Sequence, residues 1–171
     1  MPSIRTVARA AAVAVVLAAP AAAHAQELGR PAMRIRPVVV TQEDIVAAET
    51  RGEGYAISGR FAEARSAYRE AVTLRVRAKE SPAAAQWQIA NLYFGEGDLL
   101  RAAQTLDKLA YDASVRGEHD VRAEALIEAA FLYRAAGQRR RSADIARELR
   151  AMRAEKPLSQ DIKDEIARRI G

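Results

Sequence analysis

The sequence predicts an all-α fold, a stack of three helix pairs followed by one terminal helix. Three tyrosines each precede a glycine by four residues, and successive tyrosines are 38 and 40 residues apart. These positions are Tyr55 with Gly59, Tyr93 with Gly97, and Tyr133 with Gly137. Small residues recur three before each tyrosine and five after each glycine: Gly52, Ala90 and Ala130, then Ala64, Ala102 and Ser142. A repeat of this length is typical of helix–turn–helix units that stack on one another.

Residues 1–25 have the composition of a secretory signal peptide. Met1–Arg9 carries two arginines and no acid, Ala10–Ala23 is uncharged, and Ala23-His24-Ala25 has the pattern of a cleavage site. The uncharged run is shorter than the roughly 20 residues that a membrane-spanning helix requires. We therefore predict cleavage after Ala25 and no stable membrane insertion once the leader is removed. The alternative is a leader retained as an amphipathic anchor.

The composition beyond the leader limits the possible stabilising groups and partners. The sequence contains no cysteine, which excludes disulfides and a lipid-modified cysteine. Residues 1–25 hold two of the 27 basic side chains and none of the 22 acidic ones, so the remainder has a net charge near +3. So small an excess does not favour nucleic acid as a partner. An exported chain of this kind is expected in the periplasm or as a secreted protein.

Residues 26–41 are predicted to form an extended linker, and residues 42–157 the three helix pairs. Pro31 and Pro37 favour extended geometry in the residues before them. Thr41 is placed to cap the first helix, with Asp44 at its third position and Val40 packing on Ile45. The first unit, 42–78, then contains helices over about 42–57 and 60–78, with the turn at 58–59.

The second and third units follow the same plan. Ser81 and Pro82 are predicted to open the second unit, 82–116, as a cap and a first-turn proline. Its helices run over about 82–95 and 98–115, and Gly117 ends the last of them in the left-handed conformation. The third unit, 119–156, has helices over about 119–136 and 139–154 around Gly137, and Pro157 stops it.

The terminal segment, residues 158–171, is predicted to be a capping helix over about 159–170. Ile162, Ile166 and Ile170 recur every four residues and form one apolar stripe, while charged residues occupy the other faces. A stack of helix pairs leaves its last pair with a bare face. A helix with one apolar stripe and a charged back is the expected cover for that face.

The repeated positions resemble those of the tetratricopeptide repeat family. The second unit matches the family pattern at Ala90, Tyr93, Gly97-Asp98-Leu99, Ala102, Leu106 and Leu109. The first matches it at Gly52, Tyr55, Gly59, Phe61, Ala64, Tyr68 and Ala71. The third keeps Ala130, Tyr133 and Gly137, but has Arg139 where Phe61 and Leu99 stand. The resemblance implies a right-handed superhelix with a concave groove, and the longer period implies second helices about one turn longer than usual.

By the same resemblance, the first helices of the pairs should line a groove that binds a protein or peptide partner. The residues expected there are Glu49, Glu53, Trp87, Asn91, Phe94, Ile127, Phe131 and Arg134. Trp87 is either a binding anchor at the rim of the groove or a core residue between units. Alternatives to a groove-binding scaffold are a structural subunit or dimerisation module of a cell-envelope assembly, which would be a homo-oligomer, and an accessory domain of an enzyme on another chain.

The sequence does not favour catalysis, a metal or a cofactor. His119 is the only histidine beyond the leader, and no cysteine accompanies it as a zinc ligand. We interpret His119 as a solvated residue near a helix start. No serine stands on a strand-to-helix turn, and the glycines at 95 and 97 lie between helices instead of after a strand. We therefore predict that the protein is not an enzyme.

The densest basic area surrounds Arg139-Arg140-Arg141. It also includes Arg134, Arg147, Arg150 and Arg153. One interpretation is a solvated helix face with ion pairs along the helix. The other is a patch for an acidic partner, either a protein or an anionic envelope polymer.

Overall fold

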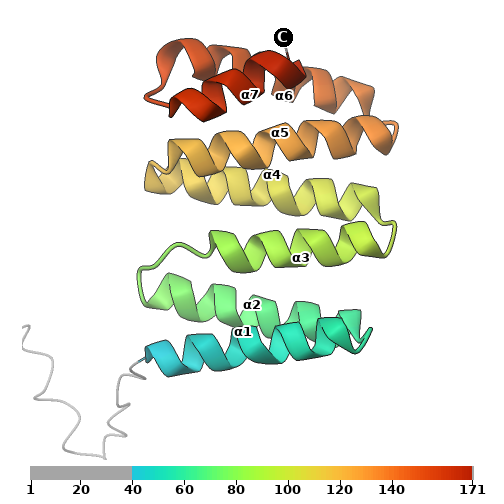
Figure 1. Ribbon diagram of the computed structural model, residues 1–171, viewed down its shortest axis with the longest axis vertical. Helices are drawn as coiled ribbons and strands as arrows, with labels where there is room; N and C mark the ends of the chain where they lie inside the picture. The colour runs from blue at the N-terminus through green and yellow to red at the C-terminus, as the bar shows by residue number, and fades with distance from the viewer. Residues whose placement is uncertain (1–39, 171) are drawn as a thin grey trace, which may run out of the picture. The chain divides into compact units, whose positions relative to one another are not determined.

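The computed structural model describes residues 40–170, and this part of the chain forms seven α-helices and no strand (Figure 1). The helices are α1 (Gln42–Ile57), α2 (Phe61–Arg77), α3 (Ala83–Gly95), α4 (Leu99–Arg116), α5 (His119–Ala135), α6 (Arg139–Glu155) and α7 (Gln160–Ile170). The all-α stack predicted from the sequence is confirmed. The predicted leader and nearly all of the predicted linker lie outside the described residues. Within 40–170, no helix has both the length and the apolar character of a membrane span.

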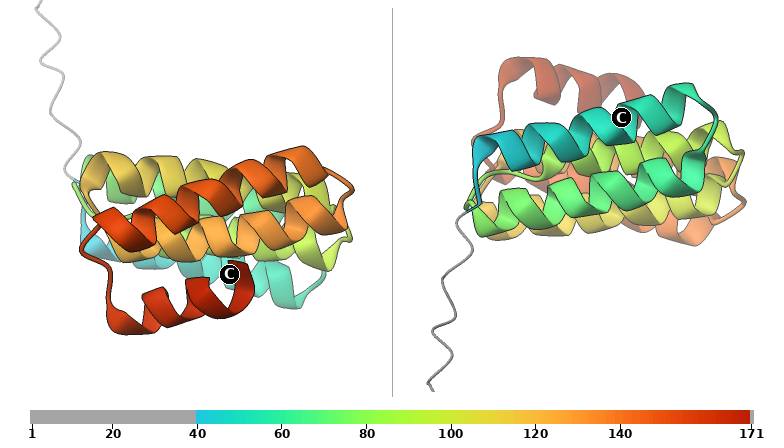
Figure 2. Two further views of the ribbon diagram at one scale, coloured as in Figure 1. Left: turned by 90° about the horizontal axis from the view of Figure 1, so that it is seen from above. Right: turned by 90° about the horizontal axis from the view of Figure 1, so that it is seen from below.

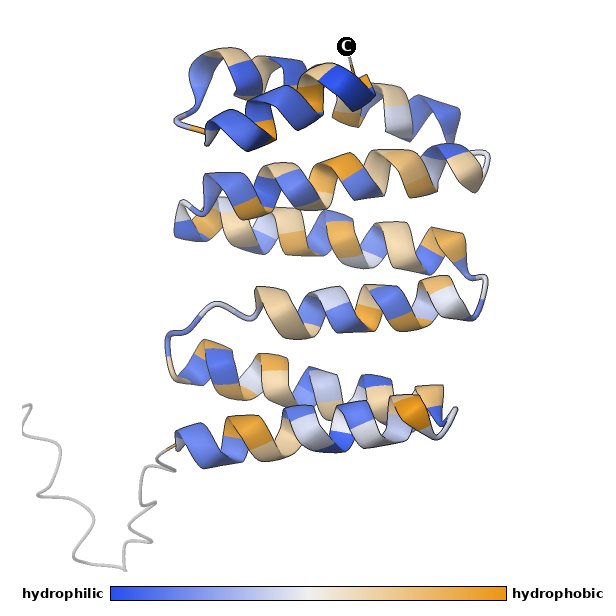
Figure 3. Ribbon diagram, viewed as in Figure 1, coloured by the Kyte–Doolittle hydropathy of each residue, from blue (hydrophilic) through white to orange (hydrophobic). Residues whose placement is uncertain are grey.

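The helices form a stack in which each contacts its neighbours in the sequence. Helices α1 and α2, α3 and α4, and α5 and α6 pack as pairs, and the pairs join through α2 with α3 and α4 with α5. Helix α7 contacts both α5 and α6. Every helix carries hydrophilic and hydrophobic residues, as expected for helices that bury one side (Figure 3).

The start of α1 has the capping box expected from its sequence. The Thr41 hydroxyl accepts a hydrogen bond from the backbone N–H of Asp44 at 3.2 Å, and the Asp44 carboxylate accepts from the N–H of Thr41 at 2.9 Å. The hydrogen bonds that the Asp44 carboxylate accepts from the backbone N–H and the hydroxyl of Thr41 lower the pKa of Asp44. Two of the otherwise unsatisfied donors at the helix start are therefore paired.

The start of α3 differs from the prediction. Ser81 makes no capping bond; its hydroxyl donates instead to the carboxylate of Glu118 at 3.0 Å, and Pro82 occupies the N-cap position. The same loop is held by Arg116, whose guanidinium donates to the carbonyl oxygen of Glu80. Gly117 does end α4 as predicted, with a φ of 73° that favours glycine. The loops before α3 and before α5 are therefore tied to each other.

Small residues allow the paired helices to approach closely. Ala64, Ala90 and Ala102 are buried, as is Gly52 in α1. A Cβ atom at Gly52 would lie 2.9 Å from Cζ of the Tyr68 ring in α2, which is too close for a stable contact. The repeated small position therefore has a direct steric cause in the first unit.

Helix α7 covers part of the last pair. Ile162 and Ile166 are buried in a core cluster that also contains Leu149 and Met152 of α6, and Ile170 packs at its edge. At the start of α7, the backbone N–H of Ser159 donates to Asp120 of α5 at 3.0 Å. The apolar stripe predicted for this helix is thus the side that packs on the stack.

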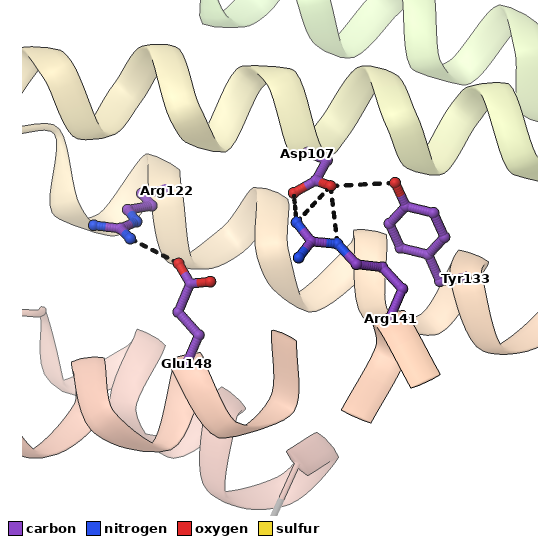
Figure 4. A network of polar contacts seen from close by, with 5 residues as sticks. All are labelled: Asp107, Arg122, Tyr133, Arg141 and Glu148. Carbon is purple, nitrogen blue, oxygen red and sulfur yellow. Dashed lines mark hydrogen bonds and ion pairs between the residues drawn. The ribbon is translucent and has the colours of Figure 1, made fainter. Parts of the chain in front are cut away.

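Polar contacts also connect α4, α5 and α6 (Figure 4). Asp107 of α4 accepts hydrogen bonds from the Arg141 guanidinium, at 2.7 Å to each carboxylate oxygen from Nη2, and from the Tyr133 hydroxyl at 3.2 Å. Arg122 of α5 pairs with Glu148 of α6 at 2.7 Å. Burial and the Asp107 charge raise the pKa of Tyr133. Arg141, part of the predicted basic patch, is therefore engaged between helices.

Candidate binding face

One side of the stack is formed by the first helices of the pairs together with α7. We call this surface, made by α1, α3, α5 and α7, the first-helix face. Helix α7 projects to the same side as α1 when the stack is viewed along its long axis (Figure 2). It packs on both α5 and α6. Three crevices open along this face.

The first crevice lies between α1 and α3 and has a volume of about 480 Å³. Glu49 and Glu53 line it, beside the exposed apolar side chains of Val46 and Ile57. Glu49 is held by Arg75 of α2, with hydrogen bonds of 2.7 and 3.0 Å. Within residues 40–170, Glu53 forms no ion pair. This crevice is therefore acidic with apolar edges.

The second crevice, of about 280 Å³, lies between α3, α5 and α7. Its lining residues are Trp87, Glu124, Ile127, Glu128, Ile162 and Glu165. Trp87 is half-buried: it packs against the core cluster and still lines the crevice. Partial burial, followed by the charges of Asp120 and Glu165, raises the pKa of Glu124. Like-charged carboxylates therefore gather beside an indole ring.

The third crevice, of about 410 Å³, lies between α5, α6 and the end of α7. Its basic lining residues are Arg134, Arg139, Arg150 and Arg169. Phe131 lies among them, with 46% of its surface exposed, and the Arg169 guanidinium is 5.8 Å from its ring centroid. Arg169 also pairs with Glu128, which lines the second crevice. An ion pair therefore separates the acidic crevice from the arginine-rich one.

The structure places six of the eight residues predicted for the groove in these crevices. Glu49 and Glu53 line the first, Trp87 and Ile127 the second, and Ile127, Phe131 and Arg134 the third. Ile127 is 2% exposed and forms part of the floor. Asn91 and Phe94 are exposed on α3 but line none of the three.

The groove residues predicted from the sequence omitted the acids of the second crevice and three arginines of the third, Arg139, Arg150 and Arg169. Glu124 lies three residues before Ile127, on the same side of α5, so the helical spacing contained a signal for it. Glu165 comes from α7, whose approach to α5 is set by tertiary packing. Arg139 and Arg150 belong to the basic area recognised in the sequence. No local sequence feature distinguishes the arginines that line the crevice from those that do not.

A further groove, of about 530 Å³, opens on the opposite side between α2 and α4. Two of its three cations are neutralised, because Arg101 pairs with Asp98 at 3.3 Å and Lys108 with Asp112 at 2.7 Å. The third, Arg69, donates a hydrogen bond to the Tyr93 hydroxyl at 3.0 Å. Asp112 also accepts a hydrogen bond from Gln86. These contacts stabilise the second unit internally, and the groove offers less uncompensated charge than the first-helix face.

The described residues hold no cluster of histidine, cysteine and carboxylate side chains suited to a metal ion. His119 differs from its predicted solvated state. It is half-buried, and its Nδ1 atom is shielded from solvent without a hydrogen-bond partner in the described part of the chain.

The fold is similar to solved structures with TPR-like repeats. A candidate kinesin light chain of Podosopora anserina with nearly identical TPR-like repeats matches with a TM-score of 0.52 at 22% identity, over 68% of this chain and 58% of that one. A variant of the same protein matches with a TM-score of 0.51 at 22% identity, over 67% and 57%. The chain thus spans less than two thirds of these structures. No family model and no curated protein matches the sequence. At this identity the likeness shows a TPR-like repeat fold.

Proposed function

We propose that this protein is an exported, non-catalytic scaffold that binds a peptide or helix of a partner protein on its first-helix face. The observation that carries the proposal is the row of three crevices along α1, α3, α5 and α7. Each offers an accessible apolar or aromatic side chain: Ile57 in the first, Trp87 in the second and Phe131 in the third. The solved structures with TPR-like repeats support a stack of this kind but do not identify a partner of this chain.

Apolar anchors in crevices with charged rims are a usual basis for specific recognition. Most binding energy at interfaces comes from a few aromatic or large side chains that become fully buried. A segment lying across the first-helix face would cover Phe131 and the exposed edge of Trp87 together. Its own side chains would then enter the crevices at the spacing of the units.

The exported location forms part of the proposal and rests on the leader pattern of residues 1–25. Its support is the positively charged start, the uncharged run and the Ala23-His24-Ala25 site. The periplasm or the extracellular space would be the setting in which the partner is met.

A structural or dimerisation role is the second candidate, and one observation favours it. Tyr111 and Val115 of α4 are 69% and 72% exposed, and they lie outside the first-helix face. Exposed apolar residues close together on a helix are typical of contact surfaces. Light scattering coupled to size exclusion separates the two roles, because a self-assembling module would elute as an oligomer.

The test of groove binding is affinity capture from a cell-envelope extract with three baits. These are the wild-type protein, Phe131→Ser on the first-helix face and Tyr111→Ser on α4 as the matched control. We expect proteins captured by the wild type and by Tyr111→Ser to be lost with Phe131→Ser. Loss with Tyr111→Ser alone would instead support the structural role. Acrylamide quenching of Trp87 fluorescence, before and after addition of a captured partner, then reports directly on the second crevice.

A further inference from the structure

The third crevice has an excess of positive charge that no other part of the described chain compensates. Arg169 is paired with Glu128 and Glu165, and Arg150 donates to the carbonyl oxygen of Ile170 at 2.8 Å. Arg134 and Arg139 form no ion pair within residues 40–170. No carboxylate lines the crevice. Two guanidinium groups therefore face it without an acidic partner.

The nearby arginines outside the crevice fall into two groups, paired and unpaired. Arg141 is bound to Asp107, Arg147 to Asp144 and Arg122 to Glu148. Arg140 and Arg153, on the same helix as Arg139, also form no ion pair within the described residues. They are exposed, as Arg134 and Arg139 are, but they do not line the crevice. These two residues are therefore matched controls for charge alone.

The crevice also has an apolar component. Helix α7, with 11 residues, is shorter than α6, with 17, and the crevice lies beside Ile170, the last residue of α7. Phe131, Ala143 and Ala146 contribute apolar surface there. Arg134 and Arg139 are exposed at the edge of this apolar surface. A guanidinium can pair with a carboxylate through two parallel hydrogen bonds.

We infer that this crevice is a docking site for an acidic segment of a partner protein, one that presents carboxylates next to an aliphatic side chain. The carboxylates pair with Arg134 and Arg139, and the aliphatic group lies on Phe131. The first and second crevices are acidic and would repel such a segment, so the acidic part of any partner is directed to the α5–α7 end. The third crevice belongs to the first-helix face and also includes Arg139 and Arg150 of α6, so this inference rests on the proposed function and specifies the chemistry of the partner segment.

The inference is tested with the purified protein and a defined probe, the peptide Leu-Glu-Glu-Leu-Glu-Glu. Its counterpart with glutamine in place of glutamate is the neutral control. Calorimetric titration gives the affinity, and amide NMR shifts locate the bound peptide. We expect the acidic peptide alone to bind and to shift residues around Phe131 and Arg139. We expect the double variant Arg134→Gln/Arg139→Gln to weaken binding by about fivefold or more, whereas Arg140→Gln/Arg153→Gln leaves it within about twofold.

Several results would overturn the inference. These are no binding of the acidic peptide, equal binding of the glutamine peptide, equal loss in both double variants, or displacement of the peptide by inorganic phosphate at a similar concentration. The last would show a simple anion site. Melting curves confirm that each variant is folded, and Arg139→Gln alone provides a milder change if the double variant is unstable. Captured partners that depend on Phe131 but not on Arg139 would support the proposed function and refute this inference.

Discussion

At the scale of single residues, the contact between Gly52 and Tyr68 shows why the first unit has glycine at a position where the other two units have alanine. The Tyr68 ring is 7% exposed and lies where a Cβ atom at position 52 would have to be. The position is helical and does not require the conformational freedom of glycine. Its identity is therefore determined by the neighbouring helix.

Gly52→Ala is expected to destabilise the protein by about 1–3 kcal/mol, because a buried ring must move to admit the methyl group. Gly54→Ala is the matched control: it lies in the same helix, and nothing is within 4 Å of its added Cβ. Since alanine has the higher helix propensity, this control should stabilise by about 0.5–1 kcal/mol. Urea unfolding measures both changes, and an equal effect of the two substitutions would contradict the steric explanation.

Glu124 gives a prediction about pH. Partial burial and the charges of Asp120 and Glu165 raise its pKa in the folded chain above the unfolded value. A raised carboxyl pKa means that the folded state binds the proton more tightly, so this residue's contribution to stability falls as pH rises through that pKa.

Glu124→Gln should therefore raise the free energy of unfolding at about pH 7, and with it the melting temperature. The gain should be only a few tenths of a kcal/mol, because the side chain is largely exposed. The gain should shrink toward zero at about pH 3.5, where the wild-type carboxyl is itself protonated. Calorimetric scans at the two pH values measure the difference. The same gain at both would show that the amide stabilises for a reason other than charge.

At the scale of the helices, α7 contributes apolar surface that the last pair cannot supply itself. Leu158, Ile162 and Ile166 are all buried on the stack. Each such side chain contributes roughly 1.5–3 kcal/mol through burial. Without them, Leu149 and Met152 of α6 would lose their cover.

Truncation after Pro157 should sharply lower the melting temperature or cause aggregation. Ile166→Ala is a milder test and should cost about 2–5 kcal/mol, whereas the exposed Arg168→Ala should change stability by less than about 0.5 kcal/mol. Thermal melts followed by circular dichroism measure all three proteins. A truncated chain with an unchanged melting curve would show that α7 adds nothing to the fold.

The helices themselves were predictable from the sequence, because their signals are local. The Thr41 cap, the turn at Gly97 and the stop at Pro157 all placed helix ends within about two residues of those observed. The cap expected at Ser81 failed because its hydroxyl finds Glu118, 37 residues away. The prediction of the second crevice was incomplete for the same reason, because Glu165 comes close to Glu124 only when α7 packs on α5.

At the scale of the whole molecule, the proposed export predicts a specific product. Protein recovered from its native cells should have an intact mass corresponding to a chain that starts at Gln26, because Ala25 ends the cleavage pattern. Mass spectrometry of the soluble envelope fraction measures this. Recovery of a chain retaining residues 1–25 from membranes would favour the anchor.

The packing of each helix on its sequence neighbours also determines how the described part of the chain should fold. Since these contacts close only short loops, folding is expected to be fast, and unfolding can begin at either end of the stack without disturbing its centre. Native-state hydrogen exchange should then find the slowest amides in α4 and α5, which have neighbours on both sides, and faster exchange in α1 and α7. A partner bound to both α5 and α7 would slow amide exchange at that end alone. The order in which the helices exchange would therefore show whether a partner is bound there.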